Sequence, residues 1–212
     1  MISIIDCHTG NIGSVVNMVK HIGQDAQVVT TPQQILRAEK LIFPGVGHWD
    51  NAARKLQDSG LRSAILQALN TGTPLMGICL GMQLLFDCSE EGKHEGLCVI
   101  PGAIKRFDFS RLPEKLTNGS HKLRIPHMGW NAVTSCAVND PMLADLDSDA
   151  NFYFAHSYHA SDVPKEYQVL TCHYGYDFVC GVNHRNVWGF QFHPEKSHKF
   201  GMQLLRNFAR AV

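Results

Sequence analysis

The sequence predicts an α/β fold in which helices flank a central, mostly parallel but mixed sheet, with added antiparallel strands in the C-terminal half. Three observations lead to this prediction. Short apolar runs alternate with helix-length segments in the first half of the chain, strand-like segments dominate after about residue 97, and residues 197–212 carry apolar side chains at helical spacing. Alternating strands and helices are typical of a parallel sheet covered by helices. We expect one domain over residues 1–212.

The first half of the chain supplies the parallel part of this sheet. Its apolar runs are short enough to be strands and are separated by segments of helix length. The expected helices cover residues 12–22, a short stretch after Pro32, and residues 49–70. The expected strands lie at residues 2–5, 26–29, 40–43 and 74–78.

The second half changes character. Strand-like segments linked by Gly, Asn, Asp and Pro follow one another with few helical periods, which predicts an antiparallel or mixed extension of the sheet. The final segment places Phe200, Leu204, Phe208 and Ala211 at helical spacing, so we expect an amphipathic helix that packs on the sheet. Residues 108–122 are polar enough to form a mobile loop. The four expected strands lie at residues 152–159, 168–174, 178–183 and 187–193.

Composition excludes several classes of partner. The 19 basic and 19 acidic side chains give a formal net charge of zero, so the whole chain offers no electrostatic attraction to nucleic acid or to an anionic membrane. Its apolar runs are too short to span a membrane and no signal sequence precedes the first strand, so we expect a cytoplasmic protein. Seven cysteines without a Cys-x-x-Cys pair indicate free thiols. His156 and His159 lack a third ligand at a suitable spacing, and we expect neither a metal nor another cofactor.

Residues 74–86, Pro-Leu-Met-Gly-Ile-Cys-Leu-Gly-Met-Gln-Leu-Leu-Phe, place Cys79 between an apolar strand and a segment compatible with a helix. Gly77 and Gly81 stand two residues to either side of it, a pattern typical of a nucleophile elbow, where glycines give clearance to a sharp turn. The dipole and free N–H groups of the following helix favour thiolate over thiol. The N–H of Leu80 is expected to point toward an oxyanion. The alternative is a buried structural cysteine.

Residues 189–197 contain the histidine that best suits such a nucleophile. In an extended chain, residues two apart share a face, so Gln191, His193 and Glu195 are expected to point in one direction. Glu195 would then orient one ring nitrogen of His193 and leave the other for the thiol. Pro194 lacks an N–H and suits the end or edge of a strand. The alternative is a surface turn around His-Pro-Glu.

Two glycines follow the apolar run at residues 40–43, in the segment Phe-Pro-Gly-Val-Gly-His-Trp. A backbone with two glycines at the end of a strand can turn its N–H groups into a pocket. We therefore expect the amides of Val46 and Gly47 to complete an oxyanion hole with Leu80, the alternative being an ordinary turn. The glycines at residues 10–13 are explained by a tight turn between strand and helix and form no GxGxxG motif.

In this chain order, the three elements resemble the class I glutamine amidotransferases: Gly-Ile-Cys-Leu-Gly around Cys79, Pro-Gly-Val-Gly at residues 44–47, and Phe-His-Pro-Glu at residues 192–195. The resemblance covers nearly the whole chain. It implies that Cys79 attacks the side-chain amide of glutamine, that His193 moves the proton to the leaving ammonia, and that a thioester is hydrolysed to glutamate. Glu195 orients His193 in this scheme. The residues implied to hold the substrate are Gln83, His156, Ser157 and Tyr158.

Ammonia released into water is lost as ammonium, so the resemblance also implies a synthase partner docked over the site. Four segments, residues 9–18, 126–131, 152–159 and 192–197, are most similar to members that serve a (β/α)8-barrel cyclase in histidine biosynthesis. The apolar side chains of residues 126–131 are equally compatible with a core position. The implied interface residues are Pro126, Met128, Trp130 and Lys196.

Three alternatives remain open at this stage. A paralogue with the same catalytic residues can supply ammonia to another synthase, such as one that makes amino or amidino sugars of surface polysaccharides. A stand-alone thiol hydrolase or peptidase can use the same elbow, although Gln83 and the segment Phe-His-Pro-Glu-Lys-Ser fit a glutaminase better. A non-catalytic binding subunit would keep the fold without a working triad.

Overall fold

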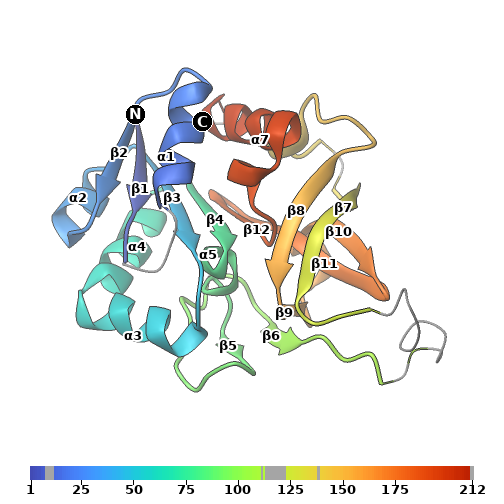
Figure 1. The fold of residues 1–212 in the computed structure, drawn as a ribbon. Coiled ribbons are helices and arrows are strands. Elements are labelled where there is room, and N and C mark those ends of the chain that lie inside the picture. Colours follow the sequence, from blue (N-terminus) through green and yellow to red (C-terminus); the bar gives the residue numbers. More distant parts are fainter. Residues whose placement is uncertain (8–11, 111, 113–122, 138, 211–212) are drawn as a thin grey trace.

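Twelve strands of the described chain pair into a sheet with the order β2-β1-β3-β4-β12-β11-β10-β7-β8, and β5, β6 and β9 join it beside this path (Figure 1). The computed structural model describes residues 1–212 except 8–11, 111, 113–122, 138 and 211–212. The strands are β1 (Ile2–Ile5), β2 (Ala26–Val29), β3 (Lys40–Gly45), β4 (Leu75–Cys79), β5 (Cys88–Ser89), β6 (Ala103–Arg106), β7 (His127–Ser135), β8 (Asn151–His156), β9 (Tyr158–Ser161), β10 (Gln168–Tyr174), β11 (Tyr176–His184) and β12 (Val187–Phe190).

Helices connect these strands mainly in the first half of the chain, and no described helix is long and apolar enough to cross a lipid bilayer. The α-helices are α1 (Ile12–His21), α2 (Pro32–Leu36), α3 (Trp49–Asp58), α4 (Leu61–Asn70), α5 (Leu80–Gln83) and α7 (His198–Arg210). Three short 3-10 helices add η1 (Pro141–Leu143), η2 (Lys165–Tyr167) and η3 (Pro194–Lys196).

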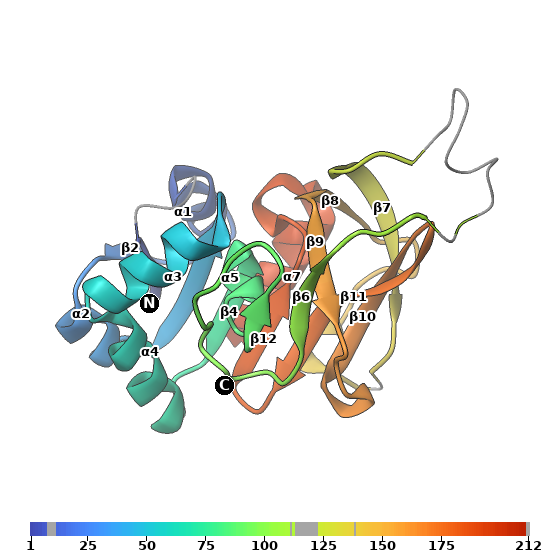
Figure 2. The same cartoon turned by 90° about the horizontal axis from the view of Figure 1, so that it is seen from below.

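Five parallel strands, β2, β1, β3, β4 and β12, form the half of the sheet that is covered on both faces. Neighbouring residues on one strand, such as Ile4 and Ile5, belong to two separate core clusters because successive side chains point to opposite faces. One cluster includes side chains of α3 and α4, and the other includes side chains of α1 and α7. Burial on both faces explains why β1, β3, β4 and β12 are largely apolar, whereas β2 at the edge is partly exposed (Figures 1 and 2).

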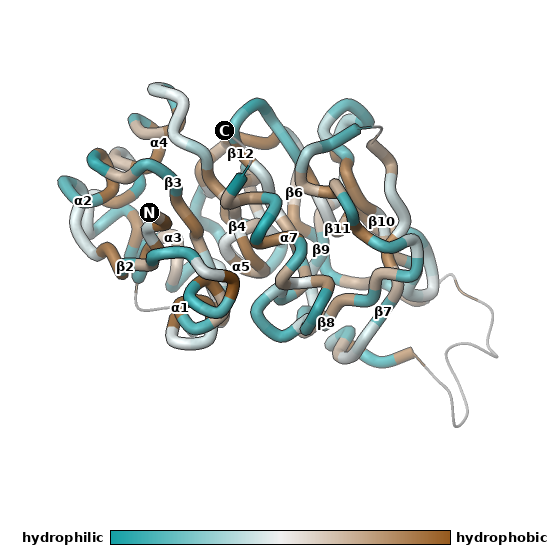
Figure 3. The backbone as a smooth tube through the Cα atoms, turned by 90° about the horizontal axis from the view of Figure 1, so that it is seen from above, coloured by the Kyte–Doolittle hydropathy of each residue, from teal (hydrophilic) through white to brown (hydrophobic). Residues whose placement is uncertain are grey.

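The other half of the sheet is antiparallel, and β12 joins the two halves. It pairs in parallel with β4 on one side and antiparallel with β11 on the other. The strands β11, β10, β7 and β8 then follow as antiparallel neighbours. Figure 3 shows apolar stretches gathered in the interior strands and helix faces, with hydrophilic stretches in the outer loops. The predicted mixed α/β fold is therefore confirmed.

The helix expected after Cys79 is much shorter than residues 80–86. It ends after one turn, at Gln83, because the next three carbonyl groups are used elsewhere. Leu84 accepts a hydrogen bond from the N–H of Leu97 at 2.7 Å, and Leu85 accepts one from Val99 at 2.8 Å. These bonds to residues 97–100 replace the hydrogen bonds that would continue the helix.

Three other expected segments are divided differently. The helical region at residues 49–70 breaks at Gly60, whose φ of 72° no α-helix accommodates. The strand expected at residues 152–159 bends at Ser157, so that β8 pairs with β7 while β9 pairs with β6 and β11. Residues 10 and 11 of the predicted turn, most of the loop at 108–122 and Ala211 lie outside the described residues, while residues 12 and 13 begin α1.

Candidate active site

Cys79 lies at the junction of β4 and α5, at the carboxyl end of a central strand. Its backbone has φ 54° and ψ −110°, a conformation that residues other than glycine rarely adopt. Such backbone strain persists where the surroundings enforce it and is common at active sites. The predicted sharp turn with Cys79 at its tip is therefore present, and the side chain is 6% exposed.

The glycines that flank Cys79 are explained by close backbone contacts. A Cβ atom on Gly77 would lie 2.8 Å from the carbonyl oxygen of Gly81 and 2.9 Å from the backbone of Met82. A Cβ atom on Gly81 would overlap the carbonyl oxygen of Phe43 on β3. Gly45, which pairs with Cys79 in the sheet, approaches Gly81 from the same side. The absence of a side chain at Gly77 therefore lets α5 fold back on β4, and its absence at Gly81 lets the turn pack against β3.

His193 and Glu195 form a buried pair behind the cysteine. The Nδ1 atom of His193 lies 2.7 Å from Oε1 of Glu195, and the two side chains are 4% and 5% exposed. The extended geometry expected for this segment is wrong, because β12 ends at Phe190 and Pro194 begins a 3-10 turn. The carbonyl of His193 accepts a hydrogen bond from Oγ of Ser197 at 2.6 Å. A closed turn, rather than strand alternation, therefore brings the carboxylate to the imidazole.

The charge state of His193 is set by its two neighbours. Burial alone lowers the pKa of His193, but hydrogen bonds and charge interactions with Cys79 and Glu195 outweigh it and raise that pKa to about 10. His193 therefore carries a proton at neutral pH while it contacts the sulfur. A protonated imidazole in contact with the cysteine sulfur can donate a proton to a leaving amine.

A pocket of about 210 Å³ opens above Cys79 and brings together residues from distant parts of the sequence. The side chains of His193 and Glu195 lie behind it, where they line a small adjoining cavity with Lys196. The pocket is lined by the residues predicted for the nucleophile, for the oxyanion hole and for substrate binding. Its lining residues are Val46, Gly47, Cys79, Leu80, Gln83, Glu91, Pro126, Met128, Ala155, His156, Ser157 and Tyr158.

The segment proposed for the oxyanion hole lies directly beside the cysteine. Gly45 and Cys79 are register partners at the ends of β3 and β4, so Val46 and Gly47 continue the chain along the pocket. Gly47 has φ +113°, which a residue with a side chain rarely adopts. Leu80 is the first residue of α5 and its N–H has no partner within the helix. The turn at residues 44–47 therefore sits where backbone donors can face an oxygen bound at Cys79.

Gln83 and Gln191 form a buried amide pair next to the nucleophile. Gln83 donates from Nε2 to the carbonyl of Tyr158 at 3.0 Å and to Oε1 of Gln191 at 3.1 Å. Gln191 donates in turn from Nε2 to Sγ of Cys79 at 3.8 Å. Sequence reasoning assigned Gln191 no role. The available signal was its place two residues before His193. Gln191 directly follows Phe190, the last residue of β12 that pairs with β4, so it lies close to the end of that strand and to Cys79.

His156, His127 and His159 are buried without a metal-like arrangement. His156 contacts the carbonyl of Tyr158 through Nδ1 at 2.7 Å and Nδ1 of His127 through Nε2 at 3.1 Å. Burial lowers the pKa of all three histidines below its ordinary value. The described residues contain no group of three or more His, Cys, Asp or Glu side chains that could hold a metal ion. His156 therefore lines the pocket as a neutral, hydrogen-bonded ring.

The residues expected at a partner interface are exposed. Pro126 and Met128 line the pocket, whereas Trp130 and Lys196 contact the ring of Tyr153. Met128 is 64% and Trp130 45% exposed, and Pro126 and Lys196 are also exposed. Trp130 stacks on His198 with ring centroids 5.2 Å apart. Strand alternation explains this arrangement, since β7 turns these side chains outward and buries His127 between them. The alternative interpretation, in which the apolar side chains of residues 126–131 lie in the core, is therefore wrong for Met128 and Trp130.

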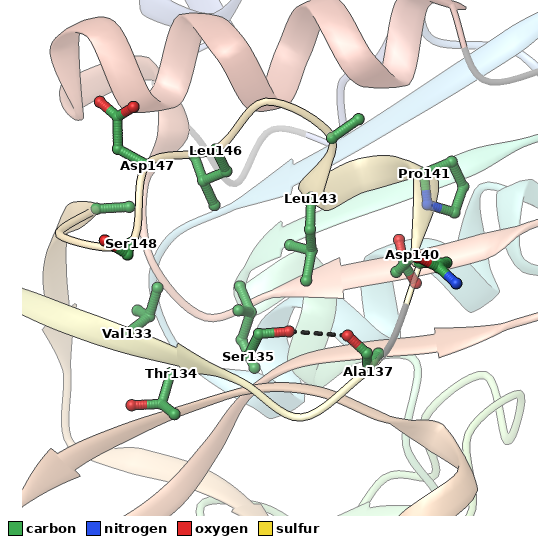
Figure 4. Close-up of a pocket in the computed structure, with 14 residues that line it drawn as sticks. Val133, Thr134, Ser135, Ala137, Asp140, Pro141, Leu143, Leu146, Asp147 and Ser148 are labelled. Carbon is green, nitrogen blue, oxygen red and sulfur yellow. Dashed lines mark hydrogen bonds between the residues drawn. The ribbon is translucent and has the colours of Figure 1, made fainter.

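A larger hollow, of about 730 Å³, lies at the far end of β7 from Cys79 (Figure 4). Its walls are the end of β7 and the segment that follows it, and Ser135 donates to the carbonyl of Ala137 within it at 2.9 Å. The acidic side chains in its lining are Asp140 and Asp147. None of the residues predicted for catalysis contributes to it, so its size does not make it the active site.

Comparison with known proteins agrees with this arrangement. The family model described as glutamine amidotransferase class-I matches residues 3–212. Over 99% of both chains, the protein is 41% identical to imidazole glycerol phosphate synthase subunit HisH of Leptospira borgpetersenii. Over the full length of both chains, it is 44% identical to imidazole glycerol phosphate synthase subunit HisH 2 of Pseudomonas aeruginosa.

Solved structures share the fold at low sequence identity. PurLQS from Thermotoga maritima superposes with a TM-score of 0.75 at 16% identity, covering 99% of this chain and 97% of that one. A crystal structure of a glutamine amidotransferase superposes with a TM-score of 0.73 at 17% identity, with the same coverage. The family match over nearly every residue and the shared fold lead to one conclusion. The chain belongs to the class-I glutamine amidotransferase family.

Proposed function

We propose that this protein is the glutaminase subunit of an imidazole glycerol phosphate synthase. In this role it hydrolyses glutamine to glutamate and ammonia, and the ammonia passes to a (β/α)8-barrel cyclase subunit of histidine biosynthesis. One observation carries the glutaminase proposal: Cys79 stands on a strained turn at the base of a pocket, with the buried His193–Glu195 pair behind it. The similarity to subunits named HisH supports the choice of synthase.

The first half of the reaction is acylation of the cysteine. The thiolate of Cys79 attacks the side-chain carbonyl carbon of glutamine, and the oxygen takes up the electron pair of the C=O bond. The N–H groups of Val46 or Gly47 and of Leu80 stabilise that oxyanion. When the intermediate collapses, the C–N bond breaks and His193 donates its proton to the departing nitrogen. Ammonia leaves, and glutamate remains bound to Cys79 as a thioester.

The second half is hydrolysis of the thioester. His193, now neutral, takes a proton from a water molecule as its oxygen attacks the thioester carbon. The C–S bond breaks with its electron pair on sulfur, which restores the thiolate of Cys79 and the protonated His193. Glu195 stabilises that imidazolium through its bond to Nδ1. Glutamate is released with no net change in the enzyme.

The amino-acid end of glutamine is held at the opposite wall of the pocket. In our proposal Gln83, Ser157 and Tyr158 bind the α-amino and α-carboxylate groups, with His156 supporting them. The two N–H groups of the Gln83 amide are used by the carbonyl of Tyr158 and by Gln191. Its oxygen Oε1 therefore remains as an acceptor for a substrate donor.

The exposed side chains around the pocket suit a docked partner. Met128 and Pro126 line the pocket and also face the surface, and Trp130 and Lys196 extend the same side of the molecule. A cyclase that covers this mouth receives ammonia before water can protonate it. Free thiols at exposed positions such as Cys136 fit a reducing compartment, so we propose a cytoplasmic enzyme.

The glutaminase proposal is tested by glutamate release in the presence of the cyclase subunit. Cys79→Ala is expected to abolish it, and Cys136→Ala, which alters an exposed thiol, is the matched control. A glutamine analogue with an electrophilic carbon is expected to label Cys79 in the wild type. Glutamate release by Cys79→Ala at the wild-type rate would refute the mechanism.

The choice of synthase is tested by the partner that copurifies. A cyclase of histidine biosynthesis, with glutaminase activity that rises on its addition, is the expected result. Copurification with a synthase of polysaccharide amino or amidino sugars would retain the glutaminase chemistry and refute the proposed pathway. Turnover of peptides or esters without any partner would instead indicate a stand-alone hydrolase.

A further inference from the structure

Gln191 is the first residue after β12 and is fully buried, with no exposed surface. Its backbone N–H donates to the carbonyl of Cys180 on β11 at 2.9 Å, which fixes the chain at this point. The side chain lies between the nucleophile and Gln83, with Nε2 3.8 Å from Sγ of Cys79. A buried amide is stabilising only where its donors and acceptors are matched, so the orientation of this one can be worked out from its neighbours.

The orientation of the Gln191 amide follows from a chain of forced choices. A backbone carbonyl only accepts hydrogen bonds, so Gln83 must present its NH2 group to the carbonyl of Tyr158, 3.0 Å away. The same nitrogen lies 3.1 Å from the Gln191 amide, which must therefore present its oxygen. The NH2 group of Gln191 is then left facing Cys79. The assignment does not depend on telling oxygen from nitrogen in the side chain.

We propose that Gln191 donates a hydrogen bond to Sγ of Cys79 and stabilises the thiolate form of the nucleophile. This inference rests on the proposed function of Cys79 in glutamine hydrolysis. A hydrogen bond to a charged acceptor is stronger than one to a neutral acceptor. The bond therefore favours the thiolate before attack and again when the C–S bond of the thioester breaks and its electron pair returns to sulfur. Gln83 keeps the donor aimed at the sulfur by holding the amide oxygen.

Few titratable groups face the sulfur, so the contribution of Gln191 can be separated from theirs. His193 and Glu195 approach from the segment after β12, and His156 approaches from β8. Glu91 lines the same pocket from the loop after β5, where its Oε2 accepts from the N–H of Trp49. Gln191 is neutral and adds no charge of its own. A change at this residue alters one donor to sulfur and leaves these charges in place.

The test measures how fast iodoacetamide alkylates Cys79 as a function of pH, by mass spectrometry of the peptide that contains it. Gln191→Met removes the donor with little change of shape, and Gln191→Glu keeps an acceptor for Gln83 while placing a carboxylate against the sulfur. We expect the pH midpoint of alkylation to rise by about one unit in the first variant, which makes the reaction about tenfold slower at pH values below the wild-type midpoint. In Gln191→Glu the rise is larger, because a nearby like charge opposes the thiolate.

Controls separate this inference from the function on which it rests. Gln27→Met changes another hydrogen-bonded glutamine, on β2, and is expected to leave the midpoint unchanged. Circular dichroism and thermal unfolding verify that each variant is folded. If one Gln191 variant does not fold, the other alone is enough to test the inference. If Cys79 of the wild type reacts no faster than exposed Cys136 at pH 7, the nucleophile itself is wrongly assigned. If it reacts faster and both Gln191 variants keep the wild-type midpoint, only the role of Gln191 is refuted.

Discussion

Glu195 uses one of its two carboxylate oxygens to contact His193. Oε1 lies 2.7 Å from Nδ1 of His193, whereas Oε2 is buried and has no hydrogen-bond partner among the described residues. A buried carboxylate that is solvated by several donors spreads its charge over all of them. Within the described part of the chain, Glu195 therefore acts mainly on the His193 ring. The high pKa of His193 follows from its contact with Cys79 and from this bond to Glu195.

Replacement of Glu195 by glutamine tests this coupling at the residue scale. Glu195 raises the pKa of His193, so Glu195→Gln is expected to lower it from about 10. Activity that needs a protonated His193 is then lost at a lower pH than in the wild type. The alkaline limb of the pH profile of kcat/KM shifts to lower pH by about 1–3 pH units. The measurement is the pH profile of glutamate release with the cyclase present. Glu166→Gln, on η2, is the control, and an alkaline limb that stays in place would contradict the coupling.

The residues of the candidate site could be predicted from the sequence better than their geometry. Cys79 and His193 stand in short motifs whose glycines and carboxylate signal their chemistry, and the structure brings both to one pocket region. Strand alternation gave the wrong account of how Glu195 reaches His193, because the sequence does not show that β12 ends at Phe190. Gln191 was left without a role because its partners, Gln83 and Cys79, are more than 100 residues away in the chain.

At the scale of elements, the site depends on how closely α5 approaches β3. Gly81 of α5 lies against the carbonyl of Phe43, and Gly45 of β3 lies against Leu80. No side chain fits between the two backbones. The distance between the nucleophile on one element and the proposed oxyanion donors on the other is therefore fixed by two glycines that face each other.

Gly81→Ala is expected to separate these two elements. The added methyl group forces either α5 or β3 to move, which costs about 1–3 kcal/mol of the free energy of unfolding and lowers glutaminase activity by about 10²-fold. Gly72→Ala adds the same methyl group in open space, at a residue with φ +93°. This control is expected to lose about 1–2 kcal/mol through backbone strain and to keep its activity per folded molecule. Equal activity losses in both variants would refute a specific role of the α5–β3 approach.

Asp50 ties a second pair of elements, α3 and the loop that carries Glu91. Its Oδ1 accepts hydrogen bonds from the N–H groups of Lys93 at 2.8 Å and His94 at 3.0 Å. The backbone bond from His94 holds the pKa of Asp50 low, at about 2, so the carboxylate is ionised at all ordinary pH values. The loop therefore remains attached to the start of α3 next to the pocket.

Loss of this attachment is expected to show in hydrogen exchange. Asp50→Ala removes the acceptor for two amides, so hydrogen exchange at the N–H groups of Lys93 and His94 should become at least about tenfold faster. A tenfold change corresponds to about 1.4 kcal/mol in the free energy of local opening. Asp58→Ala, at the other end of the same helix, is the matched control and leaves both amides protected. Unchanged protection in Asp50→Ala would show that other contacts hold the loop.

The order of helices and strands was largely predictable, whereas the ends of elements were not. Apolar runs predicted the parallel strands because burial on both faces leaves few polar positions in them. The end of α5 at Gln83 is set by hydrogen bonds from residues 97–100, which a local pattern around Cys79 does not contain. The bend at Ser157 likewise reflects pairing of β8 and β9 with different strands.

For the whole molecule, buried histidines of two kinds make stability depend on pH in opposite directions. The pKa values of His127, His156 and His159 are lowered by burial, so below about pH 6.5 the unfolded chain binds more protons than the folded one. Stability therefore falls as the pH drops through that range. His193 has a raised pKa of about 10 in the folded protein. Its contribution is complete below about pH 6.5 and is lost as the pH rises toward 10.

The free energy of unfolding in urea is expected to pass through a maximum between about pH 6 and 7. Each group that titrates differently in the two states contributes a slope of up to about 1.4 kcal/mol per pH unit. In Cys79→Ala, which removes one partner of His193, the alkaline decline should become shallower. Phe in place of His159 should reduce the acidic decline. A profile without any alkaline decline would contradict the high pKa of His193.

The position of β12 has a consequence for how the molecule is made. It is the last strand in chain order, yet it fills the middle of the sheet between β4 and β11. Until β12 is in place, the folded strands β4 and β11 each hold an open edge, with main-chain groups free to pair with other molecules. The insertion of β12 into the sheet thus also brings His193 and Glu195 to Cys79. Until that step occurs, Cys79 lacks its catalytic base.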